Sequence, residues 1–206
     1  MQRRVRPGRW PYALTALSTL AFLAAGVALR TPARGEVQRR PGMDVLLVTI
    51  DTLRADAVGA YGRAGGPTPW IDRLAARGVL FRNAHAHNVV TLPSHANILS
   101  GRLPFEHGVR DNAGFRFPKG METLATRLSS RGYRTGAFVS AFTLESRFGL
   151  DRGFDVYDDR FADGATASAF VLPERPGAET AAAARDWLAA GGGRPSFACS
   201  LGRQAR

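Results

Sequence analysis

A threonine, Thr91, has the chemistry and the local context of a nucleophile. It begins the stretch Thr91-Leu92-Pro93-Ser94-His95-Ala96-Asn97-Ile98-Leu99-Ser100-Gly101. The stretch predicts a loop that turns into a helix, because Pro93 suits a first helical turn, Ser94 can cap it and Gly101 can end it. A helix N-terminus favours an anion. The stretch therefore fits a hydroxyl that attacks a phosphate or sulfate ester, with an ordinary Ser/Thr-capped surface helix as the open alternative.

A carboxylate, Asp51, follows a second informative stretch. Residues 44–50 form a nearly continuous apolar, β-branched run, which is typical of a strand buried on both faces of a parallel sheet. Ligands of open α/β sheets bind beyond the carboxyl ends of the strands. Asp51 is therefore well placed to hold a divalent cation, although a strand-terminal Asp alone is often only the cap of the next helix.

With both stretches in view, the chain resembles the N-terminal part of the sulfatase family, within the alkaline phosphatase superfamily. The resemblance runs from Asp44 to about Asp159 and rests on an ordered set of segments: Val48–Asp56, Thr68–Ala75, Gly78–Ala84, Thr91–His95, His107–Asn112, Gly132–Thr135 and Phe148–Asp155. It implies an α/β fold with a mostly parallel sheet flanked by helices, alkaline phosphatase-like. It also implies a metal-dependent enzyme that acts on sulfate or phosphate esters.

The chain departs from the sulfatase pattern at five positions. Thr91 stands where sulfatases carry a Cys or Ser that is converted to formylglycine, and His95 stands where they carry an Arg. Ser140 and Phe142 replace the Lys and His that hold the sulfate, and Thr52 replaces the second Asp of the metal pair. A Thr nucleophile is what the phosphodiesterase-like and phosphotransferase branches of the superfamily use, so the resemblance implies a Thr-nucleophile type.

The resemblance implies a role for each site residue. Thr91 is the nucleophile, and Asp51 and Thr91 hold a divalent metal ion (Ca, Mg, Mn or Zn) that lowers the pKa of the hydroxyl. Asn112 holds a non-bridging oxygen of the ester. His95 belongs to the catalytic set and hydrogen-bonds either the substrate or a neighbour. We therefore expect a sulfatase-like hydrolase; the alternatives are an inactive membrane-tethered fragment and a transferase that moves a phospho-containing headgroup onto an envelope acceptor.

The remaining histidines are interpreted as structural. His85 and His87 form a His-x-His pair that could bind zinc, but no third ligand lies nearby in the sequence. His107 precedes a glycine and is expected to organise the loop that presents Asn112.

The intervening sequence predicts the elements that carry the site. A helix is expected to start at Thr68-Pro69 and to stop at Gly78, followed by a strand over 79–84, which together suggest a parallel βαβ unit. Further predictions are a helix over 122–131, a strand over 135–140, a surface loop over 148–157, a helix over 178–190 and a strand that begins at 195–199.

The N-terminal residues predict export. Residues 1–30 combine an Arg-rich start with an apolar segment from Tyr12 to Leu29, which is typical of a signal anchor or signal peptide. Residues 31–42 are expected to be a linker, and residues 43–206 the N-terminal part of the sulfatase-like domain, incomplete at its C-terminus. The expected location is the cell membrane, with the domain facing the periplasm or exterior, or secretion if the signal is cleaved.

Charge and cysteine content exclude other classes of protein. The net charge of +11 divides into +7 over residues 1–40, +3 over residues 194–206 and only +1 over residues 41–193. A nearly neutral domain argues against nucleic-acid binding. The single cysteine, Cys199, offers no internal disulfide, so the fold depends on its core.

The C-terminal stretch is expected to be truncated. In the family, the helix over 178–190 is followed by a buried strand and a His-containing loop, and Leu201–Arg206 shows neither the completed strand nor the loop. The Asp and His ligands that the family places later also lack counterparts.

Overall fold

A computed structural model describes residues 18–19, 40–62, 68–161 and 173–203. The chain divides between Met1–Pro41 and Gly42–Arg206, and the account below concerns the second unit. Most of the predicted signal or anchor segment lies outside the described residues. Within those residues, no helix has the length and apolar character that crossing a bilayer requires.

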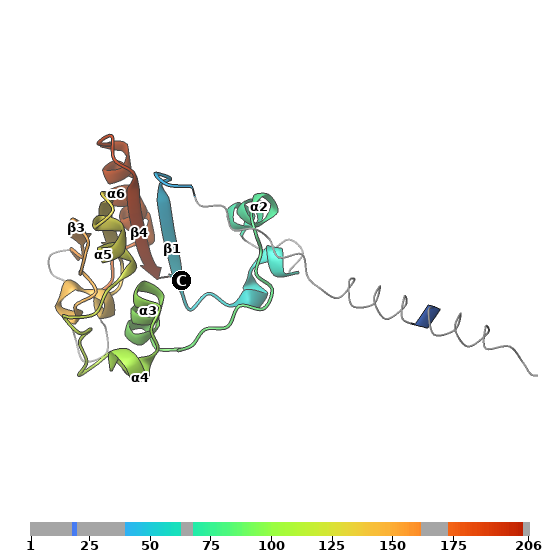
Figure 1. The fold of residues 1–206 in the computed structure, drawn as a ribbon, viewed down its shortest axis with the longest axis horizontal. Helices are drawn as coiled ribbons and strands as arrows, with labels where there is room; N and C mark the ends of the chain where they lie inside the picture. The colour runs from blue at the N-terminus through green and yellow to red at the C-terminus, as the bar shows by residue number, and fades with distance from the viewer. Residues whose placement is uncertain (1–17, 20–39, 63–67, 162–172, 204–206) are drawn as a thin grey trace, which may run out of the picture. The chain divides into compact units, whose positions relative to one another are not determined.

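The core of Gly42–Arg206 is a parallel sheet of four strands, all within the described residues (Figure 1). The order is β1-β4-β2-β3, so the last strand of the chain lies between the first and the second. The strand bounds are β1 Val45–Asp51, β2 Arg134–Val139, β3 Val156–Asp158 and β4 Ser196–Arg203. The expected α/β class with a mostly parallel sheet is confirmed.

Residues that the sequence marks as helix ends are found at the ends of α2 and α3, whereas α5 is shorter than the predicted helix over 122–131 and α4 was not predicted. Pro69 starts α2, and Gly101, in the left-handed conformation with φ 66°, ends α3. The Thr123 hydroxyl caps α5 by accepting the backbone N–H of Thr126. The bounds are α2 Pro69–Arg77, α3 Thr91–Ser100, α4 Pro104–His107, α5 Leu124–Ser129 and α6 Gly177–Ala189; short 3-10 turns cover Ala55–Ala57, Gly59–Tyr61, Phe142–Leu144 and Ser146–Phe148.

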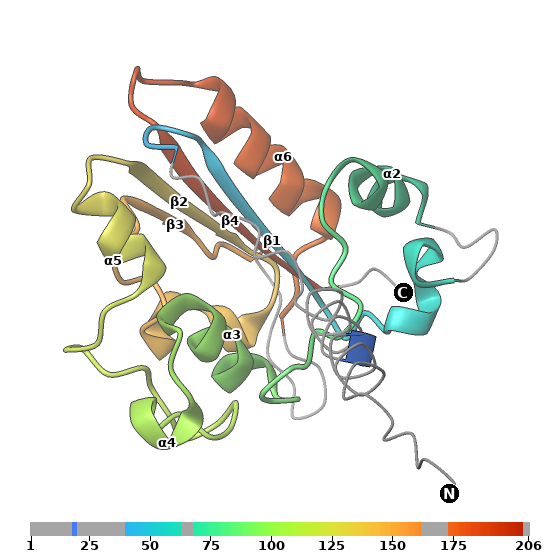
Figure 2. The same ribbon diagram turned by 45° about the vertical axis from the view of Figure 1, so that its right-hand side comes forward.

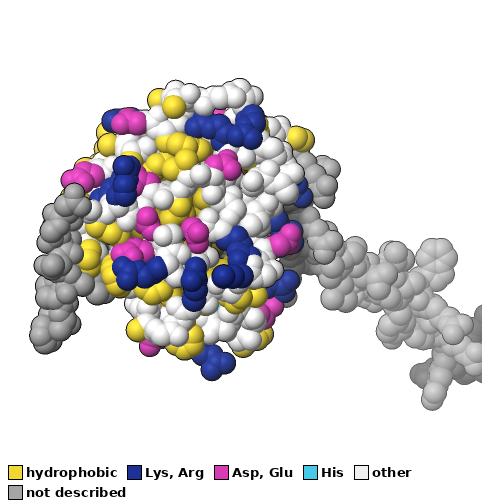
Figure 3. Space-filling model, turned by 90° about the vertical axis from the view of Figure 1, so that its left-hand side faces the viewer, with side chains coloured by type: hydrophobic (Ala, Val, Ile, Leu, Met, Phe, Trp, Pro, Cys, Tyr) yellow, Lys and Arg dark blue, Asp and Glu magenta, His cyan; other side chains and the backbone are white. Residues whose placement is uncertain are grey.

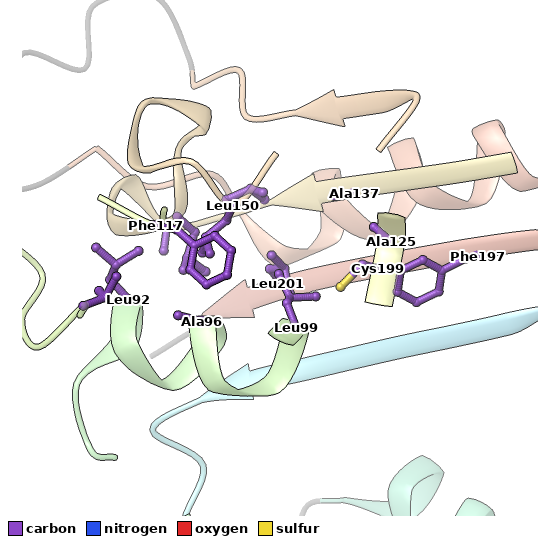
Figure 4. Packing of buried hydrophobic residues seen from close by; sticks show 14 residues of the cluster. Leu92, Ala96, Leu99, Phe117, Ala125, Ala137, Leu150, Phe197, Cys199 and Leu201 are labelled. Atoms are coloured by element: carbon purple, nitrogen blue, oxygen red, sulfur yellow. The ribbon is translucent and has the colours of Figure 1, made fainter. Parts of the chain in front are cut away.

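The helices form one layer on each side of the sheet. Helices α3 and α5 lie on one face and α6 lies on the other (Figure 2). Leu92, Ala96 and Leu99 of α3 are fully buried and belong to one core cluster with Leu201 of β4, and Figure 4 shows Leu99 nearest to Leu201 among them. Cys199 is a core residue, fully buried in the same cluster, and this burial raises the pKa of its thiol to about 12.

Helix α6 packs on β2 and β4 through a close contact. Gly136 of β2 lies directly beneath the ring of Trp187, where an added Cβ would stand 3.0 Å from the indole carbons. The same ring contacts Phe138, with centroids 5.9 Å apart. Because the indole occupies the space that a side chain at position 136 would fill, this face of the sheet is covered over β2 and β4.

The prediction that β1 is buried on both faces is wrong. Its burial alternates, with Val45 and Leu47 packed against the core while Leu46 and Val48 are 60% and 54% exposed. Strand β1 is an edge strand in the described sheet, and α6 packs on β4 and β2. The apolar run therefore marks a strand but does not reveal how many of its faces are covered.

Three other predictions need correction. Residues 79–84 form no strand; Val79 and Phe81 are 79% and 70% exposed, and without a neighbouring strand an apolar run cannot form a ladder, so the predicted βαβ unit is absent there. The stretch 148–157 is not simply a surface loop, because Leu150 is fully buried. Strand β4 extends through Arg203, past the point at which we expected it to break off.

Candidate active site

Asp51 and Thr91 meet at the carboxyl end of the sheet, although they are forty residues apart. The Thr91 hydroxyl donates a hydrogen bond to Oδ2 of Asp51 over 3.0 Å. Asp51 is the last residue of β1 and Thr91 is the first residue of α3, so Thr91 lies within the helix and not in the loop ahead of it. Both side chains are half-buried. The structure thus brings together the predicted nucleophile and a carboxylate that can accept its proton.

His95 joins the same strand to the same helix from inside the core. Its Nδ1 lies 2.9 Å from the carbonyl oxygen of Thr91, and its Nε2 lies 2.9 Å from Oγ1 of Thr49. A carbonyl can only accept, so Nδ1 carries the proton of a neutral ring and Nε2 accepts the Thr49 hydroxyl proton. Burial lowers the pKa of His95, while the Thr91 carbonyl and the Asp51 charge oppose that shift. The ring is therefore a neutral link between β1 and α3.

Asn112 lies at the N-terminus of α3, and one hydrogen bond fixes the orientation of its side chain. Its side-chain oxygen Oδ1 accepts the backbone N–H of Leu92 over 2.8 Å. The amino group Nδ2 makes no hydrogen bond within the described residues. This assignment of the amide follows from its partner, because a backbone N–H can only donate. Asn112 therefore presents a free N–H donor beside Thr91.

The first turn of α3 offers fewer free donors than its sequence suggested. Leu92 donates to Asn112, Pro93 has no N–H, and Ser94 donates to the carbonyl of Val90 over 3.0 Å. No side-chain cap is present, so the predicted cap by Ser94 does not form. Among these residues, the backbone N–H of Thr91 and the Nδ2 group of Asn112 are the donors that remain for an anion.

Thr52 is the one non-glycine residue in the described chain with a positive φ, at 59°. This conformation is unfavourable for a β-branched residue and is found most often at functional sites. Thr52 directly follows Asp51 and is exposed. The turn ends β1 at the carboxylate and directs the chain away from the site.

The metal ligands within the described residues are too few for a divalent cation. Asp51 and Thr91 supply one carboxylate and one hydroxyl, and no group of three or more His, Cys, Asp or Glu residues comes together in the described chain. Mg²⁺ and Ca²⁺ require six or more oxygen ligands, and zinc usually requires four ligands. The residues present do not make up a metal site by themselves.

The remaining histidines lie away from Thr91 and Asp51. His85 and His87 are exposed. His107 is 2% exposed; its Nδ1 accepts the N–H of Val109, and its Nε2 lies 2.7 Å from the side chain of Asn97 in α3. It thus ties α4 and the chain that leads to Asn112 onto α3.

Ser140 and Phe142 have structural contacts. The Ser140 hydroxyl is buried and hydrogen-bonds that of Thr180 in α6 over 2.7 Å. Phe142 packs edge-on against Phe148, with centroids 5.9 Å apart. Neither supplies the cation that the corresponding positions of sulfatases supply.

Sequence reasoning missed Thr49, although two patterns pointed to it. Thr49 and Asp51 are two residues apart in a strand, so both project from the same face. Thr91 and His95 are four residues apart in a helix, so they also share a face. The two pairs meet as Asp51 with Thr91 and Thr49 with His95.

Comparison with known sequences identifies relatives of this chain. The sequence profile of the Sulfatase family matches residues 43–189. A Δ4,5-hexuronate-2-O-sulfatase of Bacteroides thetaiotaomicron is 32% identical over 149 residues, which cover 65% of this chain and 31% of that protein. The chain therefore spans about a third of the length of this relative.

Comparison with known structures gives the same fold. A crystal structure of a putative sulfatase from Bacteroides thetaiotaomicron matches with a TM-score of 0.60 and 30% identity, over 79% of this chain and 35% of that one. The phosphonate monoester hydrolase of Agrobacterium radiobacter matches with a TM-score of 0.62, over 78% of this chain and 40% of that one. At 21% identity, this second match speaks for the fold alone.

Proposed function

Because this chain belongs to the sulfatase family, we propose that it carries the nucleophile of an ester-cleaving site, and that Thr91 attacks a sulfate or phosphate ester. The observation that supports this most is the hydrogen bond from the Thr91 hydroxyl to Asp51, at the N-terminus of α3 and the carboxyl end of β1. A nucleophilic hydroxyl needs an adjacent group that accepts its proton, and this pair provides one.

The proposed reaction is a displacement at sulfur or phosphorus. As the Oγ1 atom of Thr91 forms its bond to that atom, its proton passes to Asp51 and the bond to the leaving alcohol breaks. The departing oxygen takes a proton from water and leaves a hydroxide. That hydroxide attacks the sulfur or phosphorus of the threonyl ester, the bond to Oγ1 of Thr91 breaks, and Asp51 returns its proton to Oγ1. In this proposal the Nδ2 group of Asn112 and the backbone N–H of Thr91 donate hydrogen bonds to the non-bridging oxygens, where charge is concentrated.

His95 fits a positioning role in this scheme better than contact with substrate. It is 3% exposed, and both ring nitrogens are hydrogen-bonded, to Thr49 and to the carbonyl of Thr91. The link fixes α3 against β1 and thereby sets the separation between the Thr91 hydroxyl and Asp51. We propose that His95 maintains this geometry as a neutral ring.

We also propose that the complete site binds a divalent metal ion. Asp51 and Thr91 are our candidates for two of its ligands, and when bound it would supply Lewis-acid activation of the hydroxyl. The other ligands would have to come from outside the described residues. We derive no step through the metal.

The nature of the ester is also a proposal. The names of the relatives favour sulfate esters, whereas a threonine nucleophile favours phosphate esters. We also retain the proposal that residues 1–30 are a signal anchor or signal peptide that places the domain at the outer side of the membrane. N-terminal sequencing of the mature protein would test it, because cleavage removes these residues and an anchor keeps them.

The test of the nucleophile is turnover of 4-nitrophenyl sulfate and 4-nitrophenyl phosphate, with and without added Mn²⁺. We expect Thr91→Ala to lower kcat by at least about a thousandfold, because the attacking atom is removed. Ser129→Ala, which removes a hydroxyl on α5 that makes no side-chain hydrogen bond within the described residues, should leave kcat unchanged. Thr91→Ser should retain measurable turnover.

The outcomes separate the candidate functions. Full turnover in Thr91→Ala would refute the nucleophile assignment. No turnover by the folded wild-type chain would favour the inactive alternative. A new alcohol ester formed when an acceptor alcohol is added would indicate a transferase, whereas release of free sulfate or phosphate alone indicates a hydrolase.

A further inference from the structure

A small hollow on the molecule is lined by three cations whose side chains have no ion-pair partner among the described residues. It measures about 300 Å³ and is lined by Arg116, Phe117, Lys119, Gly149, Asp151 and Arg152. The side chains of Arg116, Lys119 and Arg152 make no ion pair or hydrogen bond within the described residues. Three positive charges and one negative charge therefore surround a space large enough for a small ligand.

A larger hollow shows the opposite arrangement. It measures about 810 Å³ and lies between the end of α3, α4 and the start of α5. Its cations are already neutralised, because Arg102 pairs with Glu106 and Arg127 pairs with Glu122. Of the two hollows, the smaller one is therefore the one whose lining cations have no ion pair or side-chain hydrogen bond within the described residues.

The walls of the smaller hollow are held together by the backbone. The N–H of Phe117 donates to the carbonyl of Phe148 over 2.8 Å, and the Thr123 hydroxyl donates to the carbonyl of Arg152 over 3.0 Å. At Gly149, where φ is 85°, an added Cβ would stand 2.9 Å from the carbonyl oxygen of Phe117. The two segments that carry the cations are therefore fixed against each other before any ligand binds.

We propose that this hollow, which we call the basic pocket (Arg116, Lys119, Asp151 and Arg152, with Phe117 and Gly149), binds a tetrahedral oxyanion, either free sulfate or phosphate or the terminal group of a monoester. Arginine and lysine together give charge-assisted hydrogen bonds to such groups. Figure 3 shows one side of the molecule, on which Lys and Arg side chains lie among carboxylates over both its upper and its lower half.

The basic pocket is separate from the proposed ester-cleaving site. Its lining includes neither Asp51, Thr91 nor Asn112. The proposal therefore does not depend on any activity of Thr91. The one carboxylate of the pocket, Asp151, repels an anion and so lowers its affinity. A substitution at Asp151 can therefore strengthen binding, whereas substitutions of the cations weaken it.

The first experiment is an NMR titration of the ¹⁵N-labelled chain with sodium sulfate, against sodium chloride at the same ionic strength. We expect sulfate to shift the amide resonances of Phe117, Gly149 and Arg152, and chloride to have little effect. Equal shifts with chloride, or shifts with sulfate at Thr91 and Leu92 alone, would overturn the proposal. The amide resonances thus report on the two sites independently.

The second experiment compares variants of matched charge. The triple variant Arg116→Gln, Lys119→Gln, Arg152→Gln should bind sulfate at least about tenfold more weakly. The control replaces three exposed arginines outside the pocket with Gln, namely Arg82, Arg131 and Arg194, and should change the affinity by less than about twofold. Equal losses in both would show general electrostatic attraction and overturn the proposal.

Asp151→Asn gives a test in the opposite direction. Removal of the opposing charge should strengthen sulfate binding by about two- to fivefold. An unchanged or weaker affinity would contradict the proposed position of the anion. Titrations with inorganic phosphate and with glucosamine 6-sulfate then identify the source: a response to the sugar ester as well as to the free anions indicates a pocket for monoesters, and a response to the free anions alone indicates one for inorganic anions.

Discussion

The two faces of the sheet are covered to very different extents. On the face toward α3 and α5, Leu201, Val139 and Phe197 are completely buried, and the candidate site forms at the edge of this face. On the opposite face α6 packs on β2 and β4, while Leu46 and Val48 of β1 remain exposed. Similar apolar sequences therefore contribute differently to stability, depending on what lies above them.

This difference also explains where chemistry can be arranged. The covered face holds Thr49 and Asp51 against α3, where hydrogen bonds to His95 and Thr91 fix both residues. The side chains on the other face of β1 have no such partners. A hydroxyl and a carboxylate stay 3.0 Å apart only because the strand and the helix that carry them are packed together.

The largest expected effect is on the free energy of unfolding, when a leucine is replaced by alanine on each of the two faces of the sheet. Leu201→Ala removes a fully buried side chain and should lower the free energy of unfolding by about 2–5 kcal/mol. Leu46→Ala, at a position that is 60% exposed, should change it by no more than about 0.5–1 kcal/mol. Urea denaturation measures both values. Similar losses for the two variants would mean that the exposed face of β1 is covered in solution.

A smaller effect is expected where α6 meets the sheet. Gly136→Ala would place its Cβ 3.0 Å from the Trp187 ring, so the ring must shift, and we expect a loss of about 1–3 kcal/mol. Gly202→Ala is the matched control, because its Cβ would meet only an ordinary contact at 3.6 Å from the carbonyl of Thr49. Thermal unfolding compares the two. Equal stability of the two variants would contradict the packing of Trp187 on β2.

The smallest expected effect is the change in the free energy of unfolding per pH unit that comes from His95, the residue that links β1 to α3. Burial lowers the folded-state pKa of His95 below its ordinary value of 6.5. The unfolded chain therefore binds more protons below pH 6.5, and the free energy of unfolding falls as the pH falls through that range, by at most about 1.4 kcal/mol per pH unit for this group. Urea denaturation between pH 7 and pH 5 measures the slope.

Three other groups define the control for that experiment. His107 is also buried and has a lowered pKa, so a residual slope of the same sign is expected in His95→Gln. Asp158, whose pKa is lowered to about 2 mainly by its hydrogen bond from Arg160, loses its contribution only in more acidic solution. His87→Gln, at an exposed position, should leave the slope unchanged. A slope unaltered by His95→Gln would show that His95 is not the neutral link.

Local sequence was sufficient wherever local interactions decide the structure. The apolar run before Asp51 predicted β1, and Pro69 and Gly101 marked the start of α2 and the end of α3. The same kind of run at residues 79–84 misled, because no strand of the described part of the chain lies beside it to form a ladder. A strand needs a partner from elsewhere in the chain, whereas a helix forms its hydrogen bonds within its own segment.

By itself the sequence determined the kinds of group at the candidate site and their order: a carboxylate ending a strand, a hydroxyl beginning a helix, and an amide downstream at Asn112. Only the tertiary structure decided which of them meet. Packing of α3 on the sheet brought the Thr91 hydroxyl to Asp51 and placed His95 in the core. The fold also brought the cations of the basic pocket together, where they have no ion-pair partner among the described residues. These contacts join residues far apart in the chain, and their formation depends on how whole elements bury apolar surface together.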